Sequence, residues 1–133
     1  MTKIPFDFTD AVEFNRDPIP AGVYQAQIDA SYAQKVEYGK VKNTPYITLG
    51  YVITSPEEYV GRVVFSRYMI SGPGAGNTRK LLRTLEMYDD SQGALFQFNV
   101  NMLHGFAVTI KVTLKASPDG GEFNDVQTVV PAP

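Results

Sequence analysis

Residues 61–88 read GRVVFSRYMISGPGAGNTRKLLRTLEMY, a strand pattern joined to a helix pattern by a glycine-rich loop. Positions 61–70 are rich in the β-branched and aromatic residues that favour strands. Much of this strand is apolar on both faces. That pattern indicates a barrel position in which the outer face of the strand is partly covered.

The loop after this strand leads into a single helix. Pro73 and three glycines interrupt residues 71–76, and Asn77 or Thr78 can then cap a helix that runs to about Tyr88. The apolar residues of this segment are spaced to share one helix face: Leu81, Leu82, Leu85 and Tyr88. We therefore expect the helix to pack on the strands through that face.

Four more segments read as strands because apolar side chains alternate with polar ones or precede a proline. These segments are residues 23–32, 46–54, 105–115 and 125–130. A Ser-Pro-Asp-Gly-Gly turn precedes the last strand. Residues 38–44 contain a glycine, an asparagine and two lysines, and we expect a flexible basic loop there.

The order of the expected elements is three strands, one helix and two strands. A five-stranded, partly open Greek-key barrel with a helix between strands three and four is the OB-fold. We therefore predict a mostly β, OB-fold-like domain over residues 22–133. A sandwich of two sheets is the alternative, and the single helix in mid-chain makes it less favoured.

Residues 1–21 are expected to form an N-terminal arm. Pro18 and Pro20 cannot donate to a strand ladder and restrict their neighbours. Phe6, Phe8 and Phe14 lie among acidic residues, and we expect them to pin the arm to the domain. Arms of this kind exchange between subunits, so a homo-oligomer joined through the arm is a further expectation.

The charge is unevenly distributed along the chain. The net charge is −2, yet residues 34–83 hold eight of the twelve Lys and Arg residues and carry +5. The flanking segments are both acidic, and five of the eight tyrosines fall in the basic segment. A protein without net positive charge binds a polyanion when its cations gather on one face, and tyrosine suits an exposed stacking surface.

Several function classes find no support in the sequence. The chain has no Cys and one His, which excludes disulfides, thiolate sites and His-cluster zinc sites. The run from Gly72 to Lys80 fits neither the P-loop nor the dinucleotide fingerprint. We therefore expect no enzyme, no metal and no cofactor. No apolar run is long enough for a membrane helix and no secretory signal is present, so the cytoplasm is the expected location.

Basic and tyrosine residues in the second and third strands form the candidate site, because single-strand binders combine a positive groove with aromatic platforms. Phe65 and Arg67 share one face of the third strand, whereas Arg62 and Tyr68 share the other, and the sequence leaves open which face is outside. The expected nucleic-acid contacts are Lys35, Lys40, Lys42, Tyr46, Tyr51, Phe65, Arg67, Tyr68, Arg79, Lys80 and Arg83.

Short motifs along most of the chain resemble a known family. They are FDF at 6–8, PAGVY at 20–24, YITL at 46–49, GRVVF at 61–65, LLR at 81–83, LHGFAV at 103–108 and NDV at 124–126. This order resembles small phage and prophage proteins that are encoded in replication and recombination modules. The resemblance implies an OB-type fold and binding of single-stranded DNA in phage replication or recombination, with other proteins of those modules as partners. It carries over no catalytic residues.

The chain departs from single-strand binders in one respect. Many of these proteins end in an acidic tail that recruits partners, but no acid follows Asp125 here. Residues 1–17, with four acids and three Phe, are expected to serve instead. The alternative function is a protein-interaction module or a minor phage structural protein, since fold alone does not fix function.

Overall fold

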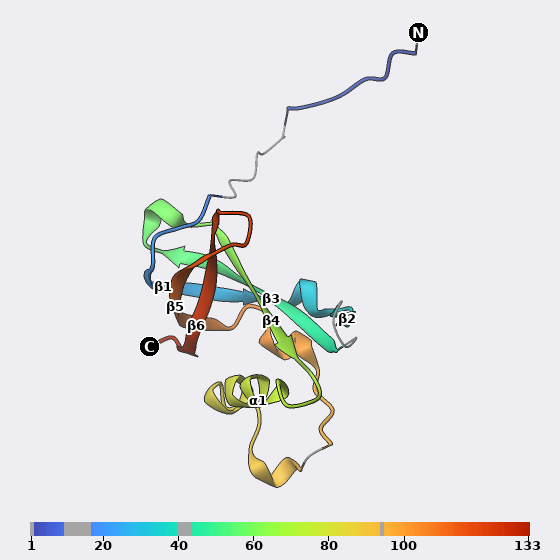
Figure 1. The fold of residues 1–133 in the computed structure, drawn as a ribbon, viewed down its shortest axis with the longest axis vertical. Helices are drawn as coiled ribbons and strands as arrows, with labels where there is room; N and C mark the ends of the chain where they lie inside the picture. Colours follow the sequence, from blue (N-terminus) through green and yellow to red (C-terminus); the bar gives the residue numbers. More distant parts are fainter. Residues whose placement is uncertain (1, 10–16, 40–43, 94) are drawn as a thin grey trace.

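The computed structural model describes residues 2–9, 17–39, 44–93 and 95–133. In these ranges the protein is mostly β with one α-helix (Figure 1). The strands are β1 (Gly22–Asp29), β2 (Glu37–Tyr38), β3 (Pro45–Ser55), β4 (Val63–Met69), β5 (Ala107–Ala116) and β6 (Glu122–Pro131). The helix is α1 (Ala75–Thr84). Four short 3-10 helices are η1 (Ala30–Ala33), η2 (Glu57–Tyr59), η3 (Asp90–Gln92) and η4 (Val100–Leu103).

The six strands form one antiparallel sheet. Its hydrogen-bonded path runs β2-β3-β1-β5-β6, and β4 pairs with β3. At Tyr46 the long strand β3 pairs with both β2 and β4, so these two strands lie on opposite edges of β3. β1 and β4 both pair with residues 50–52, so β1 continues the edge that β2 begins. The expected number of strands was five, and the extra strand β2 lies at the start of the segment predicted as a loop.

The core lies on the inner face of this sheet. Alternate residues along β1 and β5 are buried, as a half-buried strand requires, whereas β3 is buried on both faces over much of its length. Helix α1 packs at one end of the sheet (Figure 1) and contributes the leucines that its sequence spacing predicts. The buried residues of β1, β3, α1 and β5 that build most of this core include Tyr24, Ala26, Ile28, Leu49, Tyr51, Ile53, Leu81, Leu82, Leu85, Val108, Ile110 and Val112.

Two element boundaries differ from the sequence prediction for local reasons. β1 ends at Asp29, three residues early, because the Asp29 carboxylate accepts a hydrogen bond from the Ser31 amide and caps η1. α1 begins at Ala75 and ends at Thr84, and Glu86 then takes a left-handed φ of 61°, a conformation that terminates helices. Thr78 lies inside α1, where its hydroxyl donates to the Met69 carbonyl. No helix within the described ranges has the length and apolar character needed to span a membrane.

The sheet is open between β4 and β6. These two strands contact each other, but no hydrogen-bonded pairing between them occurs in the described part of the chain. α1 contacts both strands at one end of the opening. The sheet therefore curls without closing.

The N-terminal arm attaches through Ile19 rather than through its phenylalanines. Ile19 is buried, and the Asn124 side chain both donates to its carbonyl and accepts from its amide, each at 2.8 Å. Phe6 and Phe8 are exposed, and their rings contact each other at 5.9 Å. The expectation that they pin the arm to the domain is wrong for these two residues, and Phe14 lies outside the described residues.

Candidate nucleic-acid interface

The burial of alternate residues along β4 shows which of its faces is outside. Val64 is buried, and Tyr68 packs against the core, so these residues point inward. Phe65 and Arg67 alternate with them and are exposed on the outer face. The two residues that the sequence placed together as a stacking and phosphate-contact pair thus lie on the solvent side of the sheet.

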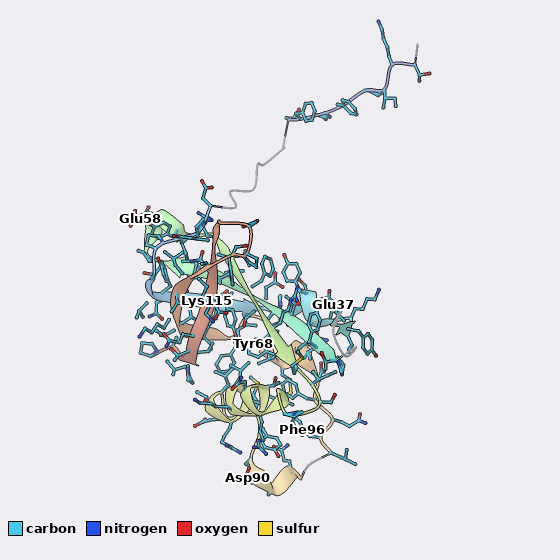
Figure 2. All side chains as sticks on the ribbon, in the orientation of Figure 1. Glu37, Glu58, Tyr68, Asp90, Phe96 and Lys115 are labelled. Atoms are coloured by element: carbon cyan, nitrogen blue, oxygen red, sulfur yellow. The ribbon has the colours of Figure 1, made fainter. Side chains whose placement is uncertain are left out.

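Tyr51 and Tyr68 do not belong to that outer face. Tyr51 is fully buried, and its hydroxyl lies 2.5 Å from the Tyr68 hydroxyl. Burial raises the pKa of both phenols, so both remain neutral hydrogen-bonding groups. The expectation that Tyr51 stacks on a base is wrong because its ring is inside the core. Tyr68, labelled in Figure 2, is partly buried and packs against the core.

The Tyr46 ring packs against the Arg67 guanidinium. The Arg67 guanidinium carbon lies 4.9 Å from the centre of the Tyr46 ring, a cation–π contact that holds the cation over the sheet. The ring itself is almost fully buried. The Tyr46 hydroxyl donates to the Glu37 side chain, and this hydrogen bond raises the pKa of the phenol. Tyr46 therefore positions Arg67 and offers little free ring surface of its own.

Tyr32 is an exposed aromatic residue of this face that the sequence analysis missed. Its ring meets the Phe65 ring edge to face, with centroids 4.9 Å apart and planes at 90°. The Tyr32 ring lies against Gly50 of β3, where an added Cβ would come within 3.3 Å of it. Because Gly50 has no side chain, the Tyr32 ring can occupy the space beside it.

Phe123 is the second aromatic residue that the sequence analysis missed. It lies at the start of β6, directly after the β5–β6 turn, and shares a groove of about 640 Å³ with Phe65 and Arg67. Asp125 also lines this groove, and its carboxylate is paired with the Lys115 ammonium at 2.6 Å. We name the set Tyr32, Phe65, Arg67 and Phe123 the outer aromatic face.

The exposure of these rings distinguishes them from the core aromatics. The exposed fractions are 46% for Tyr32, 48% for Phe65 and 46% for Phe123, whereas Tyr51 has none. A half-exposed ring keeps one face free for a planar ligand while its other face is fixed by packing. The outer aromatic face thus offers half-exposed rings from three separate elements of the fold, two of which share a groove with Arg67.

The remaining predicted cations lie around this face to different degrees. Lys35 is exposed three residues after Tyr32, and Lys40 and Lys42 lie outside the described residues. Lys80 on α1 lines a second groove together with Arg67. Arg79 and Arg83 are exposed on α1 but line neither groove, and Arg83 is paired with Asp90 at 2.8 Å. The structure thus brings Lys80 toward Arg67 and leaves Arg79 and Arg83 apart from it.

Local sequence signals mark both missed residues. Asp29-Ala30-Ser31 is a side-chain capping pattern that ends the first strand, and this break turns Tyr32 away from the inner face. Gly120 and Gly121 close the β5–β6 turn, so Phe123 begins a strand in which the polar Asn124 follows it. Both signals concern where a strand begins or ends. A strand whose register shifts by one residue turns every side chain to the opposite face.

The chain matches no protein-family model and no curated protein. The function is therefore inferred from the chemistry of the outer aromatic face, together with the family resemblance of the short motifs.

Proposed function

We propose that this protein is a non-catalytic single-stranded-DNA-binding protein and that the outer aromatic face is its binding surface. The observation that carries the proposal is the groove that Phe65, Phe123 and Arg67 line together, with Tyr32 packed against Phe65 and all three rings half exposed. Bases stack on aromatic side chains with about 1–3 kcal/mol each, regardless of sequence, and a cation beside them contacts the backbone phosphates. In duplex DNA the base faces are already stacked, so this surface favours single strands.

We further propose that the fold is an OB-fold. The hydrogen-bonded order of the strands supports it: β1 pairs with β3 and β5, β3 pairs with β4, β5 pairs with β6, and α1 lies between β4 and β5 in the chain. In an OB-fold, ligands bind over the second and third strands and the loops beside them. The corresponding strands here are β3 and β4, with Tyr32 from the loop after β1 and Phe123 from the end of the β5–β6 turn.

The biological setting proposed for this activity follows from the resemblance to phage and prophage proteins. In that setting the protein binds single strands exposed during DNA replication or recombination in the cytoplasm of the host cell. A non-catalytic role fits a site built from aromatic rings and a guanidinium, which bind bases and phosphates without activating a nucleophile.

The test is fluorescence anisotropy of a labelled oligo-dT of about 20–30 nucleotides at several salt concentrations, with duplex DNA as competitor. If about 4–6 phosphates are contacted, the logarithm of the association constant falls with log salt with a slope of about −3 to −4. Arg67→Ala is expected to weaken binding and to make this slope less steep by about 0.7. Lys111→Ala, an exposed cation on β5, is the matched control that should change neither. Binding that does not respond to salt, or that duplex competes away, contradicts the proposal.

One observation also favours the alternative function as a protein-interaction module. Residues 2–9 expose large apolar side chains that no other described part of the chain covers. Such surfaces mark contacts with other protein chains. A role in protein interaction is compatible with DNA binding because these residues are separate from the outer aromatic face.

A further inference from the structure

The arm carries an apolar stripe that has no partner within the described chain. Ile4, Phe6 and Phe8 occupy alternate positions of a non-helical segment, and their exposed fractions are 68%, 76% and 74%. Phe6 and Phe8 contact each other, but the segment lies away from the sheet (Figure 1). Large apolar side chains gathered on one side of an exposed segment are typical of a docking element.

A groove lies along the opening of the sheet between β4 and β6. It has a volume of about 530 Å³ and is bounded by β4, α1 and β6. Tyr68, Leu81, Val126 and Val129 give it apolar walls that continue into the core. β4 and β6 each have an edge facing this opening that is not paired with another strand in the described ranges. An extended segment binds such a site through apolar side chains and, at strand edges, through its main chain.

Lys3 and Asp7 make residues 2–9 neutral overall, but Asp7, which lies within the apolar stripe, is complementary to the cations of this groove. Lys80 and Arg67 line the groove, and Lys80 takes part in no ion pair within the described residues. The groove acid Asp125 is already paired with Lys115. On the arm, Asp7 lies between the two phenylalanines. Hydrogen bonds from the Thr9 hydroxyl and amide lower the pKa of Asp7, so the carboxylate is charged near neutral pH. Opposite charges steer and orient partners that meet.

We infer that residues 2–9 of one copy of this protein dock in the β4–α1–β6 groove of a second copy. Arg62 donates to the carbonyl of Asp17, which ties the base of the arm to the start of β4. The groove lies at the other end of β4, beside α1. The arm is therefore attached to its own domain at the end of β4 away from the groove. Because arm and groove are different surfaces, the contact either is reciprocal between two copies or continues from copy to copy in a ring or an open chain.

The first experiment uses the absence of cysteine from the chain. Full-length Thr9→Cys protein is mixed with full-length Gln127→Cys protein, since Thr9 adjoins Phe8 and Gln127 lines the groove. Under mild oxidation without DNA we expect a mixed disulfide dimer on a non-reducing gel, in excess over dimers of either variant alone. Absence of the mixed dimer overturns the inference. A chain carrying both cysteines that closes only on itself overturns the second-copy assignment.

The second experiment measures association by sedimentation at low salt, again without DNA. Phe6→Ser with Phe8→Ser is expected to raise the dissociation constant between copies by about tenfold or more, since buried aromatic anchors dominate such contacts. Leu95→Ser is the matched control, because Leu95 is 97% exposed elsewhere on the surface. An equal effect of the control, or no self-association of the unmodified protein, overturns the inference.

A charge exchange tests the orientation of the arm. Lys80→Asp and Asp7→Lys are each expected to weaken association severalfold, and the double variant is expected to restore part of it. Failure of the double variant to recover would place Asp7 away from Lys80 and overturn this docking geometry. Since no DNA is present in these experiments, their outcome is independent of whether the outer aromatic face binds single strands.

Discussion

The inner and outer faces of β3 and β4 carry aromatic residues of similar kind in opposite roles. On the inner face, Tyr51 and Tyr68 fill the core and bond to each other through their hydroxyls. On the outer face, Phe65 and the neighbouring Tyr32 form an edge-to-face pair that is half exposed. The type of aromatic residue therefore does not decide whether its side chain fills the core or faces solvent here. Strand parity, set by which neighbours are buried, decides it.

The largest effect is expected from Tyr51→Ala, which removes the bulkiest of the fully buried side chains. We expect the free energy of unfolding to fall by about 3–5 kcal/mol, because a cavity replaces a large core ring. Urea denaturation followed by circular dichroism measures the change. Tyr51→Phe is the milder variant, with an expected loss of about 0.5–1.5 kcal/mol for the hydroxyl contact with Tyr68. Unchanged stability of the Tyr51→Ala protein would mean that Tyr51 faces solvent and that the parity of β3 is reversed.

Phe65→Ala is expected to give the opposite combination of results. Loss of one stacking ring should weaken oligo-dT binding by about 1–3 kcal/mol, which corresponds to roughly 5- to 150-fold in the dissociation constant. The free energy of unfolding should change by less than about 1 kcal/mol because half of the ring is exposed. Anisotropy and urea denaturation on the same preparation measure both. Met102→Ala, another exposed apolar residue, is the control, and an equal loss of affinity there would remove Phe65 from the interface.

Gly50→Ala tests how Tyr32 is held on the outer aromatic face, because the Tyr32 ring lies against Gly50. The added methyl would crowd the Tyr32 ring and the Val63 side chain, so we expect Tyr32 to shift and oligo-dT affinity to fall severalfold. The cost in unfolding free energy is expected to stay within about 1 kcal/mol, because both neighbours are side chains. A double-mutant cycle with Tyr32→Ala isolates the cause. If Gly50→Ala weakens binding equally in the Tyr32→Ala background, the effect does not act through Tyr32.

The smallest effect is expected from Asp29, whose carboxylate caps η1, the short helix that contains Tyr32. Hydrogen bonds from Ser31 lower the pKa of Asp29, and the nearby His104 adds a lesser lowering. Because the folded-state pKa lies below the unfolded value of about 3.9, the ionised cap stabilises the fold fully above that value. This contribution is lost as the pH falls through the lowered pKa.

Asp29→Asn tests this pH dependence. An asparagine caps without a charge, so the variant should lose less stability between about pH 5 and pH 2 than the unmodified protein. Thermal melts across that range measure the difference. Parallel curves for the two proteins would show that the Asp29 carboxylate does not couple to folding.

Much of the sheet follows from sequence pattern, because alternation is a direct signature of a half-buried strand. Residues 105–115 alternate cleanly, and β5 occupies nearly the same range. The helix face of Leu81, Leu82 and Leu85 is confirmed as buried. β2 was missed because two residues with exposed side chains have no periodicity to read, and their pairing depends on β3. The predicted start of the helix is late because Asn77 or Thr78 is expected to cap it, whereas both residues lie inside α1 and the Thr78 hydroxyl donates to the Met69 carbonyl of β4.

The candidate site was harder to predict than the fold. Phe65 and Arg67 were placed on one face because they are two residues apart, but the sequence could not say that this face is outside. That property depends on burial of Val64 and Tyr68 by distant parts of the chain. Tyr51 was expected at the interface because tyrosine tolerates water, and the core instead satisfies its hydroxyl with a second tyrosine. Tyr32 and Phe123 come from strand ends, where sequence periodicity stops being informative.

The clamp between Asn124 and Ile19 gives the arm a mechanical link to the sheet. The Asn124 side chain forms hydrogen bonds with both the N–H and the carbonyl of Ile19, which is 105 positions away in the chain, as a neighbouring strand would. Asn124 directly follows Phe123, so a pull on the arm is delivered one residue from an aromatic side chain of the groove. Because Ile19 is itself a core residue, tension on the arm would act on the core and on the strand beside Phe123 together.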